Sequence, residues 1–425
     1  MDTIFALASA PGKAGVSVIR ISGRHAFRAG ERLARNLPPV RVAALRKLRD
    51  EHGEVIDESL VLCFPEQASF TGEPTVEIQC HGSPAVAARL LQQLSAMEGL
   101  RQAEAGEFPR RALENDRLSL TEIEGLGDLI ESETEAQRKQ ALRVMSGELV
   151  QRADTWRSQL TRAMALLEAT VDFVDEDVPV DVRPEVQDLL EKTSASMRSE
   201  LDGARWAERV RDGFRVAIVG APNVGKSTLL NYLAGREVAI TSEHAGTTRD
   251  VIEVRMDIDG MPVVFQDTAG VRDTSDAVEQ IGVARAMKTA ADADFRVHLV
   301  ASTAEIGGDI PGSGIYLLAK QDSGPSGISG ATGFGVPELL SLLSQSFAKR
   351  TASVGVAIKE RHRAAISSAL SCLETAQSQL FDENVPVEVI AEDLRQSVVA
   401  VQILVGRIDV EHVLDEIFSS FCIGK

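Results

Sequence analysis

Eight residues near the middle of the chain combine glycines, a lysine and a serine at a fixed spacing. Residues 220–227 read Gly-Ala-Pro-Asn-Val-Gly-Lys-Ser, the pattern G-x-x-x-x-G-K-S. In such a loop the backbone N–H groups wrap phosphate oxygens, the Lys226 ammonium meets the charge of the β- and γ-phosphates, and the Ser227 hydroxyl ligates Mg²⁺. An apolar run at 214–219 precedes the loop and a helical pattern at 228–233 follows it. A phosphate-binding loop requires this strand and helix, whereas an incidental glycine-rich turn does not. The expected nucleotide contacts are Gly220, Asn223, Val224, Gly225, Lys226, Ser227 and Thr228.

A predicted hairpin brings a second motif to the same end of the sheet. Apolar residues at 251–258 and 262–266 indicate two strands joined by a tight turn, and the second strand leads into Asp-Thr-Ala-Gly. Asp267 is suited to holding Mg²⁺ through water, and the Gly270 N–H to sensing a γ-phosphate. The expected contacts of this motif are Asp267, Thr268, Ala269 and Gly270.

The loop between these motifs has the composition of a nucleotide-dependent switch. Residues 246–250 read Gly-Thr-Thr-Arg-Asp, and a threonine here can close over Mg²⁺ only when the γ-phosphate is present. Val271 stands where the Ras family has the glutamine that orients water, so water activation must come from elsewhere. The acidic candidates in the segment that follows are Asp273, Asp276 and Glu279.

Recognition of the base is the least complete part of the pattern. Guanine-specific proteins have Asn-Lys-x-Asp after a strand, and this chain has Ala-Lys-Gln-Asp at 319–322. Asp322 can accept two hydrogen bonds from the guanine N1–H and N2–H₂, and Lys320 can stack its stem on the base, but Ala319 lacks the amide. Guanine fits best, and its affinity stays open. The expected base contacts are Lys320, Asp322, Ser329, Gly330 and Ala331.

The elements that must position these residues follow from hydrophobic periodicity. Strands at 15–23, 59–64 and 75–80 with a helix at 83–97 predict an N-terminal α+β domain. From about residue 213 strands and helices alternate, which is typical of an α/β domain with a mostly parallel sheet. Helical patterns flank this block, so we expect one helical domain with the α/β domain inserted into it. Its helices are expected within 119–172 and at 186–206, 354–373, 387–404 and 410–421.

Composition limits the class of protein further. A chain of 425 residues with 44% hydrophobic residues is typical of a folded protein with several domains. Its 45 basic and 63 acidic residues give a net charge of −18, so a nucleic acid must be met by a local patch. Four widely spaced cysteines favour a reducing cytoplasm over a disulfide framework. We expect neither a signal peptide nor a membrane span, because the chain has no basic leader and no run of about 18 apolar residues.

These motifs together resemble the bacterial tRNA-modification GTPase family MnmE, also called TrmE. The resemblance covers the whole chain, including both ends and the phosphate-binding loop. Besides that loop, the motifs that carry it are Ser-Val-Ile-Arg-Ile-Ser-Gly at 17–23, Val-Glu-Ile-Gln-Cys-His-Gly at 76–82, Ala-Gly-Glu-Phe-Pro-Arg-Arg-Ala at 105–112, Gly-Thr-Thr-Arg-Asp at 246–250 and Phe-Cys-Ile-Gly-Lys at 421–425.

The resemblance implies a multidomain fold of the α+β and α/β kinds. A folate-binding and dimerisation domain is expected at 1–118, a discontinuous all-helical domain at 119–212 and 350–425, and an inserted Ras-like P-loop G domain at 213–349. The implied protein is a homodimer that works with a flavin-dependent partner of the MnmG (GidA) kind. It adds a carboxymethylaminomethyl group to C5 of the wobble uridine in certain tRNAs, with the one-carbon unit from formyl- or methylene-tetrahydrofolate. GTP hydrolysis, driven by potassium-dependent dimerisation of the G domains, is required.

Several site residues are implied by the resemblance alone. The implied K⁺ ligands are Asn223, Ser242, His244 and Thr247, and the implied Mg²⁺ ligands are Ser227 and Thr248. Glu279 matches the catalytic acid that acts on the attacking water, beside Lys226 and Asp267. The implied folate contacts are Arg20, Glu77, Arg117 and Lys425. Cys422 matches a cysteine of the family's C-terminal tail that is suspected of a catalytic part.

The chain also departs from the family's pattern. Ala319 replaces asparagine, Gly330 alanine and Arg117 lysine, Ser242 and His244 are uncommon in the switch, and 301–314 is short and glycine-rich. Two other functions stay open: a G-protein switch that docks on RNA or ribosomes without small-molecule chemistry, and a scaffold with a degenerate nucleotide site. A folate pocket would argue against the first, and GTP turnover against the second.

Overall fold

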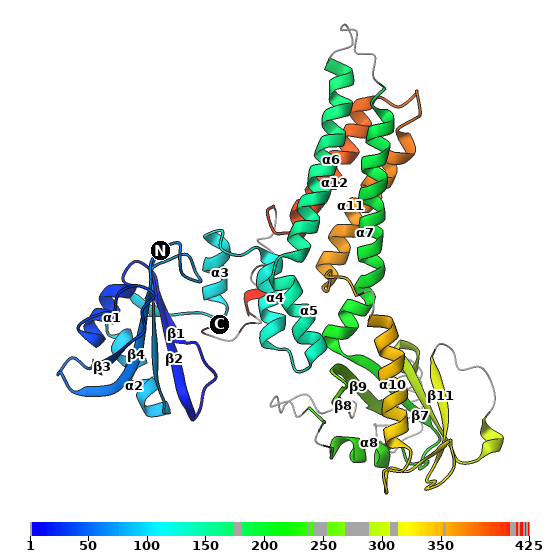
Figure 1. The fold of residues 1–425 in the computed structure, drawn as a ribbon, viewed down its shortest axis with the longest axis horizontal. Coiled ribbons are helices and arrows are strands. Elements are labelled where there is room, and N and C mark those ends of the chain that lie inside the picture. Colours follow the sequence, from blue (N-terminus) through cyan, green and yellow to red (C-terminus); the bar gives the residue numbers. More distant parts are fainter. Residues whose placement is uncertain are drawn as a thin grey trace, which may run out of the picture. The chain divides into compact units, whose positions relative to one another are not determined.

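The chain forms two compact units, one of Met1–Gly127 with Val405–Lys425 and one of Asp128–Leu404. The computed structural model describes all residues except 1, 173–180, 237, 241–252, 268–288, 307–312, 352–353, 409–413, 415–416, 420, 422–423 and 425. Among the described helices, none has the length and apolar composition that crossing a bilayer needs. The ribbon in Figure 1 follows the chain from blue to red.

The first unit is built on a six-stranded sheet of order β3-β4-β5-β2-β1-β6. Neighbouring strands are antiparallel, except that β6 runs parallel to β1. The strands are β1 (Thr3–Leu7), β2 (Ala14–Ser22), β3 (Ala44–Arg49), β4 (Val55–Phe64), β5 (Thr75–Gly82) and β6 (Leu100–Gln102). The helices are α1 (Ala26–Ala34), α2 (Pro84–Ser95), α3 (Glu107–Glu114) and α4 (Leu120–Ile130), and α4 continues into the second unit.

The two faces of this sheet have different surroundings because side chains alternate along each strand. Phe5, Ile19 and Ile21 point to the face on which α1 and α2 pack, and they form one apolar core with residues such as Leu33 and Leu90. On the opposite face a smaller cluster covers only the β1 end, with contributions from Ile4, Ala6, Phe70 and Phe108. Among the described residues, Leu45 and Leu60 on this face are exposed, and we call it the open face.

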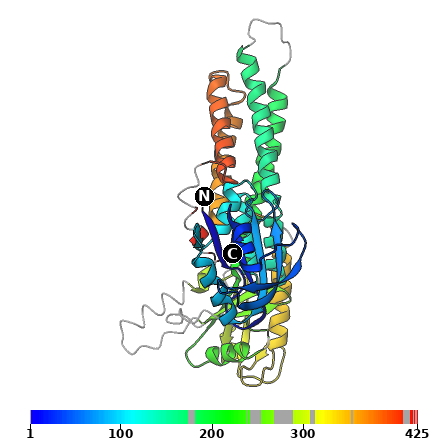
Figure 2. The ribbon, with the colours of Figure 1, turned by 90° about the vertical axis from the view of Figure 1, so that its left-hand side faces the viewer.

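The second unit contains the predicted helical layers. The helices α6 (Glu148–Asp172), α7 (Arg183–Asp212), α11 (Glu360–Gln379) and α12 (Val387–Leu404) pack side by side, as Figures 1 and 2 show. A shorter helix, α5 (Glu135–Met145), precedes them and packs on α6 and α7. A proline in its first turn opens α7, where a missing N–H costs no hydrogen bond.

One predicted helix boundary is wrong by six residues. The apolar pattern predicted a helix from residue 354, but α11 begins at Glu360, and Lys359 before it is extended. The N–H groups of Val356 and Ala357 instead donate to the Glu200 carboxylate of α7. The predicted helix at 410–421 lies largely outside the described residues.

Between α7 and α11 the chain forms a second six-stranded sheet of order β12-β11-β10-β7-β9-β8. Only the β8–β9 pair is antiparallel. The strands are β7 (Phe214–Gly220), β8 (Glu253–Ile258), β9 (Met261–Asp267), β10 (Phe295–Val300), β11 (Gly314–Ala319) and β12 (Gly327–Ile328). The other elements are α8 (Lys226–Ala234), the 3₁₀ turn η1 (Thr303–Glu305) and α10 (Val336–Thr351). This confirms the predicted α/β block and its hairpin.

Candidate active site

The glycine-rich loop lies between the end of β7 and the start of α8, at the carboxyl edge of the parallel strands. A Cβ at Gly220 would lie 2.4 Å from the Leu299 carbonyl oxygen, so the tight passage beside β10 requires glycine. Gly225 has φ +124°, a conformation that L side chains rarely adopt, and it precedes the first residue of α8. The loop therefore places its backbone at a helix N-terminus, where N–H groups point toward a bound anion.

Lys226, Ser227 and Asp267 come together at this loop. The buried Lys226 Nζ donates to the carbonyl oxygens of Gly220 and Ala221 at 2.8 and 3.0 Å. Burial lowers the pKa of Lys226, and the Asp267 carboxylate acts in the opposite direction. The Ser227 hydroxyl donates to Asp267 Oδ2 at 3.0 Å. Three residues that the motif spacing predicted for phosphate and Mg²⁺ chemistry are thus adjacent.

The base-recognition loop is linked to the phosphate loop by a lysine. Lys320 Nζ donates to the Asn223 carbonyl oxygen at 2.9 Å, and its stem passes 3.9 Å from where a Gly225 Cβ would lie. Asp322, two residues on, accepts a hydrogen bond from the Thr332 hydroxyl, a partner that no motif indicated. Ala319 ends β11 and is buried in the apolar core.

The second base loop packs directly on α8. A Cβ at Gly330 would lie 2.6 Å from the Leu229 backbone nitrogen, so glycine permits this close approach. Its neighbour Ser329 is buried, and its N–H donates to the Phe334 carbonyl oxygen at 3.0 Å. The departure from alanine at Gly330 therefore has a local packing reason in this chain.

Val224, Thr228 and Ala331 are described, whereas eight other predicted nucleotide, metal and catalytic residues lie outside the described part of the chain. They are Ser242, His244, Thr247, Thr248, Thr268, Ala269, Gly270 and Glu279. The same holds for Cys422 and Lys425 at the C-terminus.

A second polar cluster lies on the open face of the first unit's sheet. Arg20 of β2 and Glu77 of β5 are register partners, and Arg20 Nε donates to Glu77 Oε1 at 2.8 Å. The Arg20 guanidinium carbon lies 5.4 Å from the centroid of the Phe70 ring and 5.5 Å from that of Phe108. The Arg20 and Glu77 side chains are 21% and 20% exposed, which distinguishes the pair from a freely solvated one.

The third predicted folate residue borders the same cluster. Arg117 Cγ lies 3.2 Å from where a Gly72 Cβ would lie, two residues along the chain from Phe70. Arg111, which sequence reasoning missed, is 4% exposed and donates to Glu73 and Glu107 at 3.0 Å. It thereby fixes the segment that carries Phe70 and Gly72.

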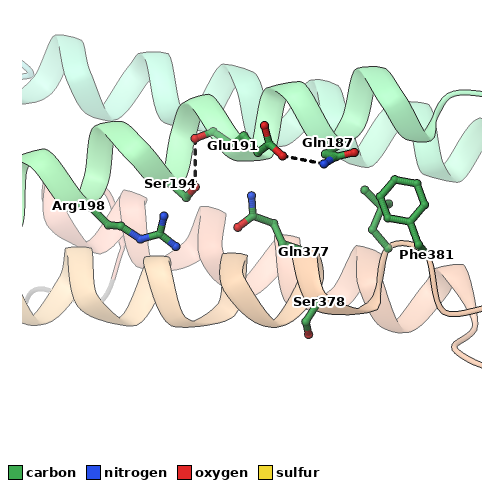
Figure 3. Close-up of a pocket in the computed structure, with 8 residues that line it drawn as sticks. Gln187, Glu191, Ser194, Arg198, Gln377, Ser378 and Phe381 are labelled. Atoms are coloured by element: carbon green, nitrogen blue, oxygen red, sulfur yellow. Dashed lines mark hydrogen bonds between the residues drawn. The ribbon is translucent and has the colours of Figure 1, made fainter.

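A separate cavity of about 440 Å³ opens between α7 and α11 (Figure 3). Gln187 Nε2 donates to Glu191 Oε1 at 2.7 Å along one wall, and Arg198 pairs with Glu374 at 2.6 Å. None of the predicted site residues lines it. Its lining residues are Gln187, Glu191, Ser194, Arg198, Gln377, Ser378, Leu380 and Phe381.

A mostly parallel sheet with a G-x-x-x-x-G-K-S loop between β7 and α8, on which a lysine, a serine and an aspartate converge, defines a Ras-like P-loop G domain. Two family models account for the rest of the chain: "GTP-binding protein TrmE N-terminus" matches residues 3–117, and "MnmE helical domain" matches residues 120–422. The chain belongs to the MnmE family of tRNA modification GTPases.

Curated relatives match over their whole length. Proteins named tRNA modification GTPase MnmE from Dinoroseobacter shibae and Cereibacter sphaeroides are 57% and 55% identical over 430 and 429 residues, with 100% of both chains covered in each case. Among solved structures, Aquifex aeolicus Era bound to GDP and aluminium fluoride is 24% identical, with 37% of this chain and 66% of that one covered and a TM-score of 0.25.

Proposed function

We propose that this chain is a potassium-stimulated GTPase that, with a flavin-dependent partner of the MnmG kind, adds a carboxymethylaminomethyl group to the wobble uridine of certain tRNAs. The one-carbon unit is expected from formyl- or methylene-tetrahydrofolate. The observation that carries the proposal is the convergence of Lys226, Ser227 and Asp267 on the glycine loop, in a chain with full-length relatives named tRNA modification GTPase. Because tRNA is the proposed substrate, we place the protein in the cytoplasm.

Each residue at the glycine-rich loop has a distinct proposed role in GTP hydrolysis. The Lys226 ammonium neutralises charge on the β- and γ-phosphates, and of its three hydrogens two are held by loop carbonyls. The Ser227 hydroxyl and the Asp267 carboxylate are oxygen donors of the kind Mg²⁺ prefers, and they are 3.0 Å apart. We propose that Ser227 and Thr248 ligate Mg²⁺, that Asp267 acts through water, and that Glu279 orients the attacking water.

The monovalent cation and the base use neighbouring positions. We propose Asn223, Ser242, His244 and Thr247 as the K⁺ ligands. A cation beside the β- and γ-phosphates supplies the charge stabilisation that an arginine finger supplies elsewhere. Asp322 would accept from guanine, Lys320 would stack on it, and the loop of Ser329, Gly330 and Ala331 would present an N–H to O6.

The first unit supports a folate site and a dimer. A carboxylate such as Glu77 can accept from the amide-like donors of a pterin, and Arg20, Arg117 and Lys425 can pair with a glutamate tail. The open sheet face beside them carries Leu45 and Leu60, which are register partners and are 55% and 41% exposed. Uncovered apolar area of this kind favours a second copy as its cover. We propose that the homodimer forms through this face.

We also propose that the domains meet at 118/119, 212/213 and 349/350. Cys422 is proposed as a candidate catalytic residue.

Potassium dependence tests the hydrolysis mechanism. We expect GTP turnover to rise several-fold in KCl over NaCl at equal ionic strength, which holds general screening constant. Asn223→Ala and Glu279→Ala should each abolish the gain, because one removes a cation ligand and the other the acid that orients water. Lys349→Ala, an exposed change on α10, should keep it. Turnover that is absent would favour the degenerate scaffold, which Ala319 suggests, and cation-indifferent turnover would favour a simple switch.

Folate binding tests the small-molecule chemistry independently. We expect tetrahydrofolate to bind the wild-type chain and Glu77→Gln to weaken binding at least about tenfold, because a half-buried charged partner of the pterin donors and of Arg20 is lost. Calorimetric titration gives both affinities. GTP turnover of Glu77→Gln should be unchanged, since Glu77 belongs to the other unit. A wild-type chain that hydrolyses GTP but does not bind tetrahydrofolate would support the alternative function, a G-protein switch without small-molecule chemistry.

A further inference from the structure

One short segment of this acidic chain carries a local excess of positive charge. Residues 20–49 hold nine Arg and Lys side chains and one acidic side chain, Glu31, whereas the whole chain has a net charge of −18. Eight of the nine are arginines. Such a local excess is the feature that contact with a polyanion requires when the rest of the molecule repels it.

Helix α1 arranges four of these arginines in one row. Ala26, Ala29 and Leu33 are buried against the sheet, so the helix surface opposite them faces solvent. Arg24 just before the helix, Arg28 and Arg32 within it, and Arg35 at its C-terminal end are all exposed. Their spacing of four, four and three residues places them along one face of the helix. We call this set the α1 arginine row.

The neighbouring edge strand extends the row. Arg46 of β3 donates through Nε to the Asn36 carbonyl oxygen at 2.7 Å, which places its guanidinium next to the end of α1. Arg46 shares its face of the strand with Leu48, which belongs to the core under α1. The basic surface therefore continues from the helix onto the sheet edge.

Several exposed arginines elsewhere in the described chain pair with a carboxylate, which no member of the α1 arginine row does. Arg138, Arg162 and Arg395 each pair with a nearby glutamate. No carboxylate in the described ranges forms an ion pair with a member of the α1 arginine row. Like charges four residues apart on a helix repel each other by a few tenths of a kcal/mol. Glu31, exposed three residues from Arg28 and four from Arg35, offsets part of this repulsion, and an anionic partner would offset the rest.

The character of the surface favours nucleic acid over an acidic protein. Protein interfaces have an apolar or aromatic centre, and the exposed side chains of α1 offer no large apolar residue. Guanidinium groups recognise phosphate through two parallel hydrogen bonds and supply most contacts to nucleic-acid backbones. A row of arginines along one helix fits the evenly charged backbone of an RNA strand.

The row also leaves the proposed folate and dimer surfaces accessible. Arg20 and Glu77 point to the open face of the sheet, whereas α1 packs on the other face through Ile19 and Ile21. Figure 1 shows α1 outside the sheet of the first unit. An RNA strand on α1 would not compete with either surface.

We propose that the α1 arginine row, extended by Arg46, binds the phosphate backbone of the tRNA substrate. The proposal rests on the proposed function, which supplies tRNA as the polyanion. It locates on this chain the local patch that the overall negative charge makes necessary.

Binding of a tRNA transcript to the full chain as a function of KCl concentration tests this assignment. The test variant is Arg28→Gln with Arg32→Gln, and the matched control is Arg183→Gln with Lys349→Gln, two exposed cations of the other unit. Both change the net charge by the same amount. The test variant should bind roughly tenfold more weakly at low salt, and the slope of log K against log [KCl] should shrink by about 1.4 to 1.8. GTP turnover should equal wild type in both, which shows that the proteins are folded.

The possible outcomes test the RNA-binding role of the α1 arginine row separately from the proposed function. Equal tRNA affinity and equal salt slope in the test variant and wild type would overturn the inference and leave tRNA as substrate; this is also the result if the row serves an acidic protein surface. Equal losses in the test and control variants would overturn it too, since net charge alone would then explain binding. A wild-type chain that hydrolyses GTP yet binds no tRNA would contradict the tRNA part of the proposed function as well.

Discussion

Lys226→Ala is expected to lower kcat/KM for GTP hydrolysis by at least about 10²-fold, the usual effect of removing one preorganised donor from a developing negative charge. Lys226 is held at the loop by the carbonyls of Gly220 and Ala221, so its ammonium reaches the phosphates without reorganising. Its burial disfavours the charged form, and the Asp267 carboxylate favours it. Phosphate release from GTP at saturating Mg²⁺ and K⁺ measures the effect.

The control for Lys226→Ala is a variant that removes a lysine far from the glycine-rich loop. Lys349→Ala removes an exposed lysine near the C-terminal end of α10, and its turnover should stay within twofold of wild type. A thermal melt of Lys226→Ala checks the fold, because two carbonyls lose a donor at a cost of about 1–3 kcal/mol. A folded Lys226→Ala protein with turnover within tenfold of wild type would mean that another group neutralises the phosphates.

The nucleotide site was predictable because its residues belong to short motifs next to strands. Lys226 and Ser227 follow a strand directly, and Asp267 ends another strand that pairs with the first, so parallel pairing alone brings them together. Contacts between distant positions were not predictable. No spacing rule connects Arg20 with Phe108, or Asp322 with Thr332, since sheet pairing and loop packing decide those contacts.

The fold was predictable where periodicity was strong. The strands β2, β5 and β7 were expected from apolar runs, but β3 was missed because its sequence, Ala-Leu-Arg-Lys-Leu-Arg, is half charged and has no apolar alternation. It lies at the sheet edge, where charged residues are normal. The segment at 354–359 has a helical pattern yet is not helical, because tertiary hydrogen bonds to Glu200 override the local preference.

Glu200 leads to the second large effect, on stability. It is 1% exposed on α7, pairs with Arg152 of α6, and accepts from the N–H of Ala357 at 2.7 Å. Glu200→Ala leaves two buried N–H groups without this acceptor, at about 1–3 kcal/mol each, whereas Arg152 is 35% exposed and keeps Glu148 as a partner. We expect the second unit to unfold at a lower midpoint concentration of urea. The amides of Val356 and Ala357 should lose hydrogen-exchange protection.

The control for this substitution is an ion pair that starts from the same helix, two residues before Glu200. Arg198 of α7 pairs with Glu374 of α11 at 2.6 Å, but the side chains are 53% and 46% exposed. Glu374→Ala should therefore cost less than about 1 kcal/mol. Glu200→Gln should fall between the two, since its amide oxygen still accepts one N–H while the charge is lost. Equal midpoints for Glu200→Ala and Glu374→Ala would show that the chain returning from the G domain is held by apolar packing, with Glu200 contributing little.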